Sequence, residues 1–433
     1  MKIKTLSLTD FRAFPGPAPA TFELDGKNLL VYGENGSGKS SLFKALSGFF
    51  THGHTPPKLR DLKNSFSGVS PGYVAVNVTL DNGLLVPWQM AIFEAFKAWN
   101  APLIQGPSLV ESHPTSPEGA MWNEIEQVAK FSAFLDYRTL LGTNYKHGNE
   151  PINLFEVMVS ELMAGYVDLA TDKSIFDLWR AVEVTLPNKN VPSYRAAALT
   201  ACNRFNDAVR RALGLLLPEA QAILKRLCPD GLELVGLPFA GVRYNGAKLA
   251  RDKAYVDKAI GLEIAFRGLA VERPQHYLNE ARQSALGLAL YLGARLACAP
   301  AASPHLKLLV LDDVLVGLDH SNRLPVLNVL VDLFPTWQVV LLTHDKGWFD
   351  LARQRLPDGD WACYEIYEGD QSAAAPMPIV RKTENHPAKA LLQKGRELLA
   401  LGYVEAAANY TRQAFEFGLR KGCEIQKDRK AHV

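Results

Sequence analysis

The sequence predicts an α/β fold with a mixed β-sheet, and two groups of residues lead to this prediction. Residues 28–32 read as a short buried strand that runs directly into a Gly-rich loop, and a helix is expected from about Lys39. Near the other end of the chain, a helix predicted over 281–299 is followed by an apolar strand, 306–311, and by a second one within WQVVLLTHD. This order of strand, helix and buried strand is what a parallel sheet covered by helices requires.

The remaining elements divide the chain into four predicted parts. A strand-like alternation near the start of the chain and a hairpin closed by an Asp-Asn-Gly turn place antiparallel sheet in the first part. A long helical stretch follows, and then the strand-like runs LELVGLPF and GLEIAFRG. The predicted domains are an N-terminal lobe (1–91), a mainly helical insertion with a short arm (92–230), a C-terminal lobe (231–375) and a helical hairpin (386–433).

Three details of the second part are expectations of their own. Four prolines mark 92–125 as irregular or loop-rich. The longest helix is predicted from Tyr194 to Leu217, where Pro218 is expected to interrupt it, which gives an arm of roughly 35 Å. Residues 134–145 read as a helix-like apolar run, and their Asp-Tyr-Arg cluster is interpreted as a core tyrosine beside a surface ion pair.

Composition excludes several classes of protein. The chain has 433 residues with 48% hydrophobic content, a formal net charge of +2 and a pI near 8.1, values too mild to indicate nucleic-acid binding by themselves, although local basic patches leave it possible. No apolar run approaches the roughly 18 residues of a membrane span, so we expect a cytoplasmic protein without an export signal. The five cysteines are scattered and form no CxxC pair, which argues against disulfides and zinc.

The loop at residues 33–40, GENGSGKS, fits the phosphate-binding pattern GxxxxGK[ST] at every fixed position. In such a loop, backbone amides face the phosphates of ATP, the lysine neutralises the β and γ phosphates, and the serine binds Mg²⁺. A chance Gly-rich turn is the alternative, but an apolar strand precedes the loop and a helix-forming run follows it. The predicted ATP-binding residues of this segment are Gly33, Asn35, Gly36, Gly38, Lys39, Ser40 and Ser41.

A second part of the same site is predicted where the apolar strand 306–311 ends. Asp312 is placed to reach the water shell of Mg²⁺ together with Ser40, and Asp313 to orient or deprotonate the attacking water. An acidic pair after a strand could also be a helix cap, and its occurrence in one chain with the Lys39 loop favours the site. His344 ends the next apolar strand, where a histidine can contact the γ-phosphate; a structural role is the alternative.

This ordered set of motifs resembles the ATP-binding-cassette (ABC) ATPases of the RecF, SMC and OLD type. Members have an FRxF element, matched by residues 11–14, a signature stretch, matched by LNEARQS at 278–284, and a GLD loop, matched by 317–319. The resemblance implies an ABC-type P-loop ATPase head that uses ATP and Mg²⁺ and pairs head to tail, as a homodimer or a higher homo-oligomer. It also implies nucleotide contacts by Arg12, Asn279 and Asp319.

Two departures from the family pattern concern the chemistry. The signature of transporter-like cassettes is LSGGQ, so Asn279 stands where that signature has serine, and Glu280 replaces a glycine. The second catalytic acid is commonly glutamate, whereas here it is Asp313, which predicts slow hydrolysis or a need for a partner to complete the geometry. The residue of the Q-loop is not identified, because Gln89 reads better as a surface glutamine.

The resemblance extends to function. Compact ATPases of this class resemble the ATPase subunits of two-gene bacterial antiphage systems such as Septu and PARIS, which implies a nucleotide-switched regulator that acts through a separate effector nuclease. A DNA-repair ATPase that binds DNA ends or gaps is one alternative, and an ATP-dependent scaffold that scarcely hydrolyses ATP is another. The C-terminal hairpin, 386–433, is predicted to be a docking or oligomerising element.

Overall fold

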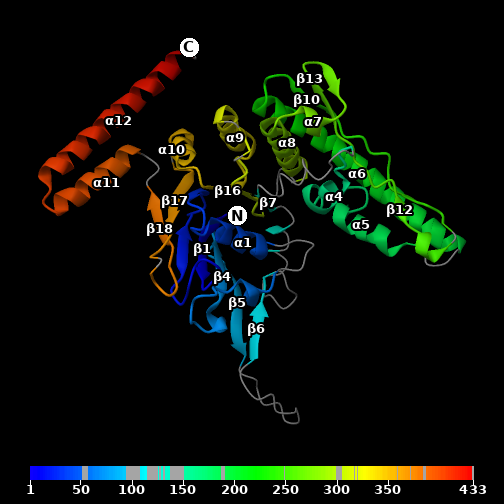
Figure 1. Ribbon diagram of the computed structural model, residues 1–433, viewed down its shortest axis with the longest axis horizontal. Coiled ribbons are helices and arrows are strands. Elements are labelled where there is room, and N and C mark those ends of the chain that lie inside the picture. Colours follow the sequence, from blue (N-terminus) through cyan, green and yellow to red (C-terminus); the bar gives the residue numbers. More distant parts are fainter. Residues whose placement is uncertain are drawn as a thin grey trace, which may run out of the picture. The chain divides into compact units, whose positions relative to one another are not determined.

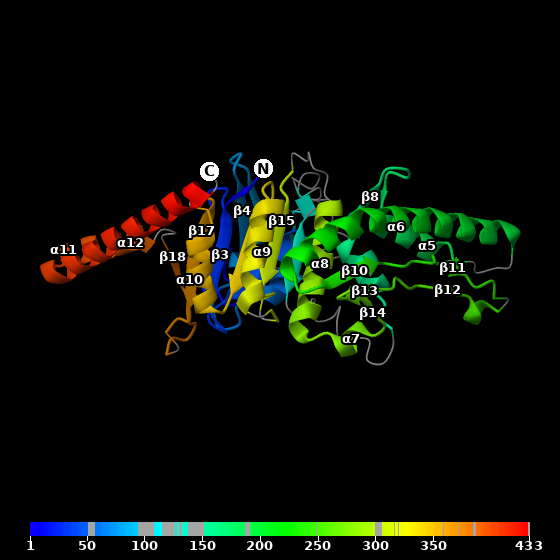
Figure 2. The ribbon, with the colours of Figure 1, turned by 90° about the horizontal axis from the view of Figure 1, so that it is seen from above.

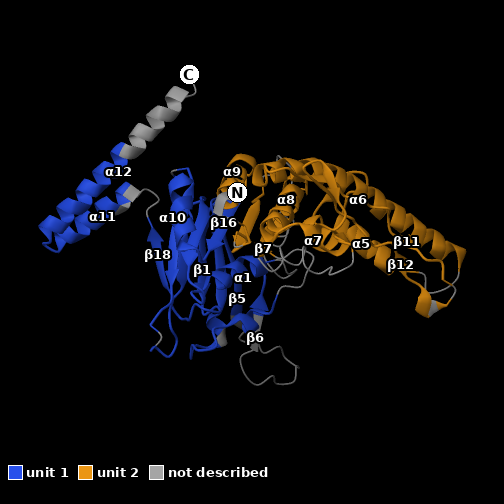
Figure 3. Ribbon diagram, turned by 45° about the horizontal axis from the view of Figure 1, so that its top comes forward, with its two compact units in different colours: residues 1–49, 56–121, 338–433 blue, residues 50–55, 122–337 orange. Residues whose placement is uncertain are grey.

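The computed structural model divides into two compact units (Figure 3). Unit 1 comprises residues 1–49, 56–121 and 338–433, and unit 2 comprises 50–55 and 122–337. No helix among the described residues is long and apolar enough to cross a membrane. The structure describes residues 1–50, 57–93, 108–114, 125, 128–129, 132–136, 151–186, 191–247, 249–298, 305–315, 317–318, 320–357, 359–370, 372–383 and 387–431.

Unit 1 contains an antiparallel sheet with the strand order β2-β1-β4-β5-β6 (Figure 1). Its strands alternate buried and more exposed residues, as expected for a sheet with one face in the core. The predicted hairpin is confirmed as β4 and β5. Within the stretch 92–125, expected to be irregular or loop-rich, β6 is a regular strand, and most of the other residues lie outside the described part. The strands are β1 (Ile3–Thr9), β2 (Ala20–Glu23), β4 (Ala75–Leu80), β5 (Leu85–Phe93) and β6 (Ser108–Ser112).

A second group of strands in unit 1 carries the Gly-rich loop. Strand β3 lies between β16 and β17 and is parallel to both, while β18 is antiparallel to β17. All six residues of β16 are buried, which is the pattern of a parallel strand covered on both faces. The elements are β3 (Asn28–Gly33), β16 (Gln338–Thr343), β17 (Trp361–Tyr367), β18 (Ile379–Thr383), α1 (Lys39–Phe49), α10 (Lys346–Arg355) and two short 3₁₀ turns (Leu59–Leu62 and Pro71–Tyr73).

Unit 2 contains the other predicted apolar strand, β15 (Leu308–Asp312), paired in parallel with β7 (Ala133–Asp136). Strand β7 corrects the helix-like interpretation of this segment, of which residues 137–145 lie outside the described part. A run of three apolar residues cannot be assigned by periodicity, because it fits a strand and a turn of helix equally well. The segment is a strand because it pairs with β15, which is distant in the sequence.

The rest of unit 2 is mainly helical, with small antiparallel sheets. Its longest helices are α6 (Pro192–Leu227) and α8 (Glu280–Cys298), which pack against each other. The strands predicted in LELVGLPF and GLEIAFRG are confirmed as β10 and β13. The other elements are α4 (Phe155–Val157), a π-helical turn (Met158–Leu162), β8 (Val167–Asp168), β9 (Lys173–Ser174), α5 (Ile175–Val184), β10 (Leu232–Gly236), β11 (Arg243–Tyr244), a 3₁₀ turn (Ala250–Asp252), β12 (Tyr255–Val256), β13 (Glu263–Phe266), β14 (Leu269–Val271), α7 (Pro274–Tyr277) and α9 (His320–Leu333).

Helix α6 continues through Pro218, contrary to the predicted interruption (Figure 2). Its 36 residues give a length of about 54 Å rather than 35 Å. Proline removes one amide from the helix, and the carbonyl left without that partner belongs to Gly214, which is exposed and can therefore bind water. Leu216 and Ala220 on either side of the proline are buried, so packing holds the helix together there.

The predicted C-terminal hairpin is confirmed as α11 (Pro387–Ala400) and α12 (Val404–Ala431), which lie side by side in Figures 1 and 2. Gly402 makes the turn with a φ of +84°, a conformation that glycine adopts without strain. Gly395 allows the close approach of the two helices, since a Cβ there would lie 3.1 Å from Thr411 Oγ1 and 3.3 Å from the carbonyl oxygen of Ala407.

The contact between α6 and α8 yields a test with a matched control. At Gly293 of α8, a Cβ would lie 2.7 Å from the backbone nitrogen of Ala220, so Gly293→Ala must push the helices apart. We expect it to lower the free energy of unfolding by about 1–3 kcal/mol. At Gly214, on α6, a Cβ would meet nothing within 4 Å, so Gly214→Ala should raise the free energy of unfolding by about 0.5–1 kcal/mol. Urea unfolding of both variants measures the two values, and equal effects would contradict the close packing.

Candidate nucleotide-binding site

Glycines shape the predicted phosphate-binding loop, which follows β3 and precedes α1. Gly36 and Gly38 have φ values of +88° and +114°, where other residues are strained. A Cβ on Gly33 would lie 2.3 Å from Ser37 Oγ, and one on Gly36 would lie 2.6 Å from a carboxylate oxygen of Glu368. Gly38 is therefore required by its backbone conformation, Gly33 by its close neighbours and Gly36 by both. Glu368, which sequence reasoning missed, lies beside the loop.

Lys39 is folded back over this loop. Its Nζ donates hydrogen bonds to the carbonyl oxygens of Gly33, at 2.6 Å, and of Glu34, at 3.0 Å, and the residue is only 5% exposed. Asn35 and Ser40 are exposed on the loop. The ammonium group is thus held against the backbone of the loop, in the motif whose lysine meets phosphate oxygens.

The predicted FRAF element, residues 11–14, packs directly on the loop. The amide of Ala13 donates a hydrogen bond to Ser41 Oγ at 3.3 Å. A Cβ on Gly38 would lie 3.1 Å from the ring of Phe14, so this ring is seated against the loop backbone. The structure therefore brings together the FRAF element and the start of α1, as the sequence predicts.

Arg12 occupies the exposed corner of the FRAF element. Its φ is +49°, an uncommon backbone conformation for a residue other than glycine. Two hydrogen bonds to its backbone hold it there: its amide donates to the carbonyl oxygen of Leu62 at 2.8 Å, and its carbonyl accepts from the side-chain Nδ2 of Asn64 at 2.6 Å. The guanidinium is consequently presented from a fixed backbone next to the loop.

His344 lies at the same edge of the parallel strands as the Gly-rich loop. It directly follows β16, whose last residue, Thr343, is paired with Tyr32 of β3, so His344 is level with Gly33. The next residue, Asp345, caps α10 by accepting a hydrogen bond from the amide of Trp348 at 2.9 Å. The exposed His344 therefore stands in a rigid turn between β16 and α10.

Lys346 fixes this turn to the strand of the phosphate loop, a feature that sequence reasoning missed. Its Nζ forms ion pairs with Glu365 of β17 and, at 3.3 Å, with Asp350. The same ammonium lies 5.1 Å from the ring centre of Tyr32 and 4.8 Å from that of Phe349. No local pattern could have revealed this cluster, because Tyr32 and Glu365 become neighbours of Lys346 only through the order of the strands.

The groups around the Glu365 carboxylate stabilise its negative charge. Burial alone would raise its pKa, yet the hydrogen bonds from Lys346 and Tyr367 and the nearby positive charges lower it below the usual range. Tyr367 donates to Glu365 at 2.7 Å, and burial together with this bond raises the pKa of Tyr367 to about 12. Glu365 is therefore ionised, and its charge anchors Lys346.

The predicted acidic pair lies in unit 2, at the end of β15. Asp312 is 7% exposed and is paired in register with Asp136 of β7, so two carboxylates end adjacent parallel strands. Asp313 has a φ of +53°, which sets its side chain off from the line of the strand. Asp136 was missed as a member of this edge because β7 was not predicted, and Asp319 lies outside the described residues.

The signature stretch in unit 2 is a turn held by hydrogen bonds. Asn279 Oδ1 accepts a hydrogen bond from the amide of Arg282 at 3.0 Å, and thereby caps α8. Gln283 is buried and donates to the carbonyl oxygen of Leu278 at 2.7 Å. Arg282 pairs with Asp230, with 2.9 Å between Nε and the carboxylate. Asn279 thus has the role of a helix cap and still faces the solvent.

The predicted metal ligands Ser40 and Asp312 lie in different units, so a joint Mg²⁺ site between them stays a prediction. Within the described ranges, no group of three or more His, Cys, Asp or Glu residues could hold a metal ion. This is compatible with Mg²⁺ in this class of site, which is bound chiefly through phosphate oxygens, water and one or two protein oxygens.

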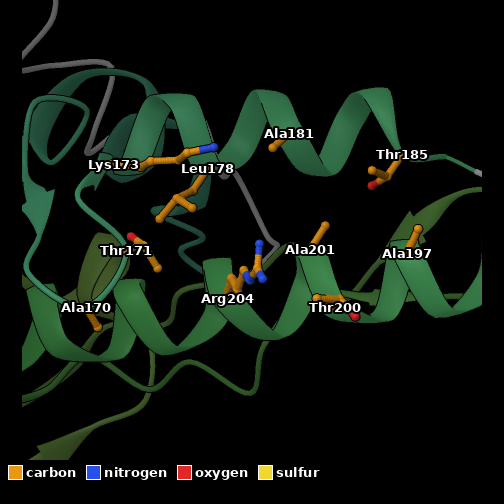
Figure 4. A pocket seen from close by; sticks show the side chains of 10 residues that line it. All are labelled: Ala170, Thr171, Lys173, Leu178, Ala181, Thr185, Ala197, Thr200, Ala201 and Arg204. Carbon is orange, nitrogen blue, oxygen red and sulfur yellow. The ribbon is translucent and has the colours of Figure 1, made fainter.

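A cavity of about 600 Å³ lies elsewhere in unit 2, between α5 and α6 (Figure 4). Small and apolar side chains form most of its lining, and Lys173 and Arg204 project from opposite sides. None of the predicted site residues lines it, so it is separate from the candidate nucleotide site. Its other lining residues are Ala170, Thr171, Leu178, Ala181, Thr185, Ala197, Thr200 and Ala201.

Comparisons with known proteins agree with this geometry. A sequence profile described as an AAA domain matches residues 5–80, the part that contains the FRAF element and the loop. The structure of the recombination mediator RecF with ATP superimposes with a TM-score of 0.51 at 15% identity, covering 88% of this chain and 97% of that one. The chain has the fold of an ABC-type, SMC-like ATPase head.

Two SMC heads are similar to the chain at lower TM-scores. The head from Pyrococcus furiosus, bound to the C-terminal domain of ScpA, has a TM-score of 0.48 at 12% identity and covers 91% of this chain and 99% of that one. The head from Thermotoga maritima has a TM-score of 0.43 at 14% identity and covers 89% and 100%. No curated protein matches the chain in sequence. The predicted α/β head with a helical insertion is confirmed as the fold.

The clamp formed by Lys346 can be tested through its effect on stability. Lys346→Met should lower the free energy of unfolding by about 1–3 kcal/mol at pH 7, because it leaves the buried Glu365 carboxylate without its cation. Without Lys346 the pKa of Glu365 should rise, because burial raises it and the main lowering partner is gone. The loss should therefore shrink as the pH falls through about 4.5 and the carboxyl is protonated. Urea unfolding at pH 7 and pH 4 measures this.

Lys382 provides a matched control for this test, because its partners Glu23 and Asp25 are exposed. Lys382→Met should cost about 0–1 kcal/mol at pH 7. A loss at Lys346 that is no larger than the loss at Lys382, or that is the same at both pH values, would contradict the proposed anchoring of the His344 turn.

Proposed function

We propose that the protein is a nucleotide-switched ATPase that binds ATP with Mg²⁺ and hydrolyses it to ADP and phosphate. The observation that carries this proposal is the position of the Lys39 ammonium, which is buried over the carbonyl oxygens of its own Gly-rich loop. A triphosphate that enters the loop offers this ammonium anionic oxygens in place of neutral carbonyls, and charge-assisted hydrogen bonds are the stronger kind. The AAA-domain match over residues 5–80 and the RecF-like fold support the same activity.

The predicted catalytic and metal-binding residues and the lysine of the loop each have a role in this proposal. Lys39 neutralises the β and γ phosphates, and Ser40 together with Asp312 holds Mg²⁺. Asp313 orients or deprotonates the attacking water, and His344 contacts the γ-phosphate. The rigid turn that carries His344, level with Gly33 and tied to Tyr32 through Lys346, supports a residue that senses whether the γ-phosphate is present.

The switch is proposed to act through a head-to-tail dimer. In this arrangement the ATP held by one chain is closed by the signature of the other, where Asn279 and the N-terminus of α8 face the γ-phosphate. Helix α8 has 19 residues, so its N-terminus carries a full helix dipole. Binding energy becomes motion because ATP binds the closed dimer more tightly than the open chains.

The output of the switch is proposed to be a separate effector nuclease of a bacterial antiphage system. The C-terminal hairpin supports a role in docking, because Leu399, Phe415 and Leu419 are more than half exposed on it. Phe415 and Leu419 are four residues apart and so share one face of α12, and exposed apolar residues that lie together mark interaction sites. The resemblance to antiphage ATPases, and not the fold, indicates a nuclease as this partner.

Two other functions are alternatives to a regulator of an effector nuclease. A DNA-repair ATPase would bind DNA ends or gaps, and DNA would stimulate its turnover with an affinity that falls steeply as salt rises. An ATP-dependent scaffold would bind ATP and scarcely hydrolyse it. The shorter acid at Asp313 favours this second alternative over the first.

The activity is tested with two substitutions. Lys39→Ala should abolish tight ATP binding, because the phosphates lose the lysine of the loop. Asp313→Asn should keep the affinity but slow hydrolysis by about 10²-fold or more, since the water loses its acid. Calorimetry gives the affinity and phosphate release gives the rate. Unchanged affinity in Lys39→Ala would refute the site.

The same phosphate-release assay separates the alternatives. An unchanged rate in Asp313→Asn would point to the scaffold, or to a different catalytic acid. Stimulation by DNA would point to the repair ATPase. The effector proposal requires that the nuclease activity of a co-expressed partner depends on both Lys39 and Asp313, and a partner that is indifferent to these two substitutions would contradict it.

The head-to-tail dimer is tested by complementation. Asn279→Asp keeps the cap of α8, because aspartate caps as well as asparagine, but it sets a negative charge against the partner's γ-phosphate. Lys39→Ala and Asn279→Asp chains should each be inactive alone. Mixed in equal amounts, they should recover about a quarter of the wild-type activity, since half of the dimers are mixed and each of those has one intact site of two. If mixed dimers are shown to form and the mixture is still as inactive as either variant alone, the head-to-tail arrangement is refuted.

A further inference from the structure

The turn at residues 63–67, close to the FRAF element, is held by an unusual number of polar contacts. Lys63 Nζ donates at 3.0 Å to the carbonyl oxygens of Asn64 and Ser67 and pairs with Asp10 at 3.1 Å. Asp10 is completely buried and also accepts a hydrogen bond from the hydroxyl of Ser67. The backbone of this turn is therefore rigid, although it lies at the surface.

Phe66 is the residue that this rigid turn presents. Its amide donates to Asn64 Oδ1 at 2.8 Å, yet its side chain is 73% exposed and is the most exposed phenylalanine among the described residues. The contacts of Lys63, Asn64 and Ser67 fix the backbone on both sides of Phe66 while its ring stays exposed. The ring is available for a ligand.

The same asparagine ties Phe66 to Arg12. Asn64 accepts from the amide of Phe66 and donates, through Nδ2, to the carbonyl oxygen of Arg12 at 2.6 Å. One side chain thus fixes the backbones of both residues. Arg12 is exposed as well, and its left-handed backbone turns it away from the core. The backbones that carry an exposed aromatic ring and an exposed guanidinium are consequently joined by one side chain.

The FRAF element contacts the phosphate loop at the end from which α1 begins. The FRAF element contacts Gly38 and Ser41, at the start of α1, whereas the Lys39 ammonium rests on Gly33 and Glu34. The lysine of such a loop marks the β and γ phosphates. The FRAF element therefore lies toward the α-phosphate, which is the side where the nucleoside of a bound nucleotide must be.

We propose that Phe66, supported by Asn64 and flanked by Arg12, forms the surface on which the base of the bound nucleoside triphosphate stacks. Bases stack on aromatic rings and on guanidinium planes, and a fixed ring loses little entropy when the base binds. The proposal rests on the proposed phosphate loop and adds the base-recognition part of the site. It makes the protein select a nucleoside triphosphate over a bare polyphosphate.

The test compares two ligands, Mg-ATP and Mg-tripolyphosphate, by calorimetry on the full-length chain. Phe66→Ala should weaken ATP binding about tenfold or more, the usual effect of losing one stacking partner, and should leave tripolyphosphate binding unchanged. Phe66→Tyr keeps the ring and should bind ATP as the wild type does. Because Phe66 is exposed, the melting temperature of both variants should equal that of the wild type.

Tyr73 is the matched control. It is 56% exposed on the neighbouring turn, and its amide is bonded to the carbonyl oxygen of Ser70 rather than to the FRAF support. Tyr73→Ala should change neither ligand's affinity. Wild-type ATP affinity in Phe66→Ala, or an equal loss for ATP and tripolyphosphate, would overturn the stacking role while leaving the phosphate loop in place. Failure of the wild type to bind either ligand would instead overturn the proposed function and this inference with it.

Discussion

The register of three parallel strands is the constraint on which unit 1 depends. Strand β3 is paired with β16 on one side and β17 on the other, with Tyr32 opposite both Thr343 and Glu365. Parallel strands end at the same edge of a sheet, so this register alone brings the Gly-rich loop, His344 and Glu368 to one level. A slip of one residue would turn each of these segments to the other face. Buried side chains on both faces of β16 and β17 make such a slip costly.

Irregular segments around this edge are held by buried ionic anchors rather than by regular structure. Asp10 and Lys63 fix the segment that supports Arg12, and Glu365 and Lys346 fix the turn that carries His344. Such pairs add little net stability over apolar contacts, but a broken pair leaves a buried charge and is costly. Their value here is geometric, because they hold exposed functional side chains on backbones that would otherwise be free to move.

The sequence was sufficient for those features that depend on local pattern. The phosphate loop, the β4–β5 hairpin, α8, β15, β16 and the C-terminal hairpin each have a motif, an alternation or a turn residue that marks them. Features that depend on distant partners were missed or wrong. Strand β7 is recognisable only beside β15, the continuation of α6 past Pro218 depends on burial of its neighbours, and Lys346 and Phe66 gain their significance from residues far along the chain.

The backbone of Asp313 gives a physical reason for the shorter acid at this position. Its φ of +53° lies in the left-handed region, which costs most residues energy and which aspartate tolerates because its short side chain can form local hydrogen bonds. Glutamate would gain reach but lose this local compensation. The length of the acid and the shape of the chain are therefore coupled, so an evolutionary exchange of one acid for the other at residue 313 would require a compensating change in the backbone that follows β15.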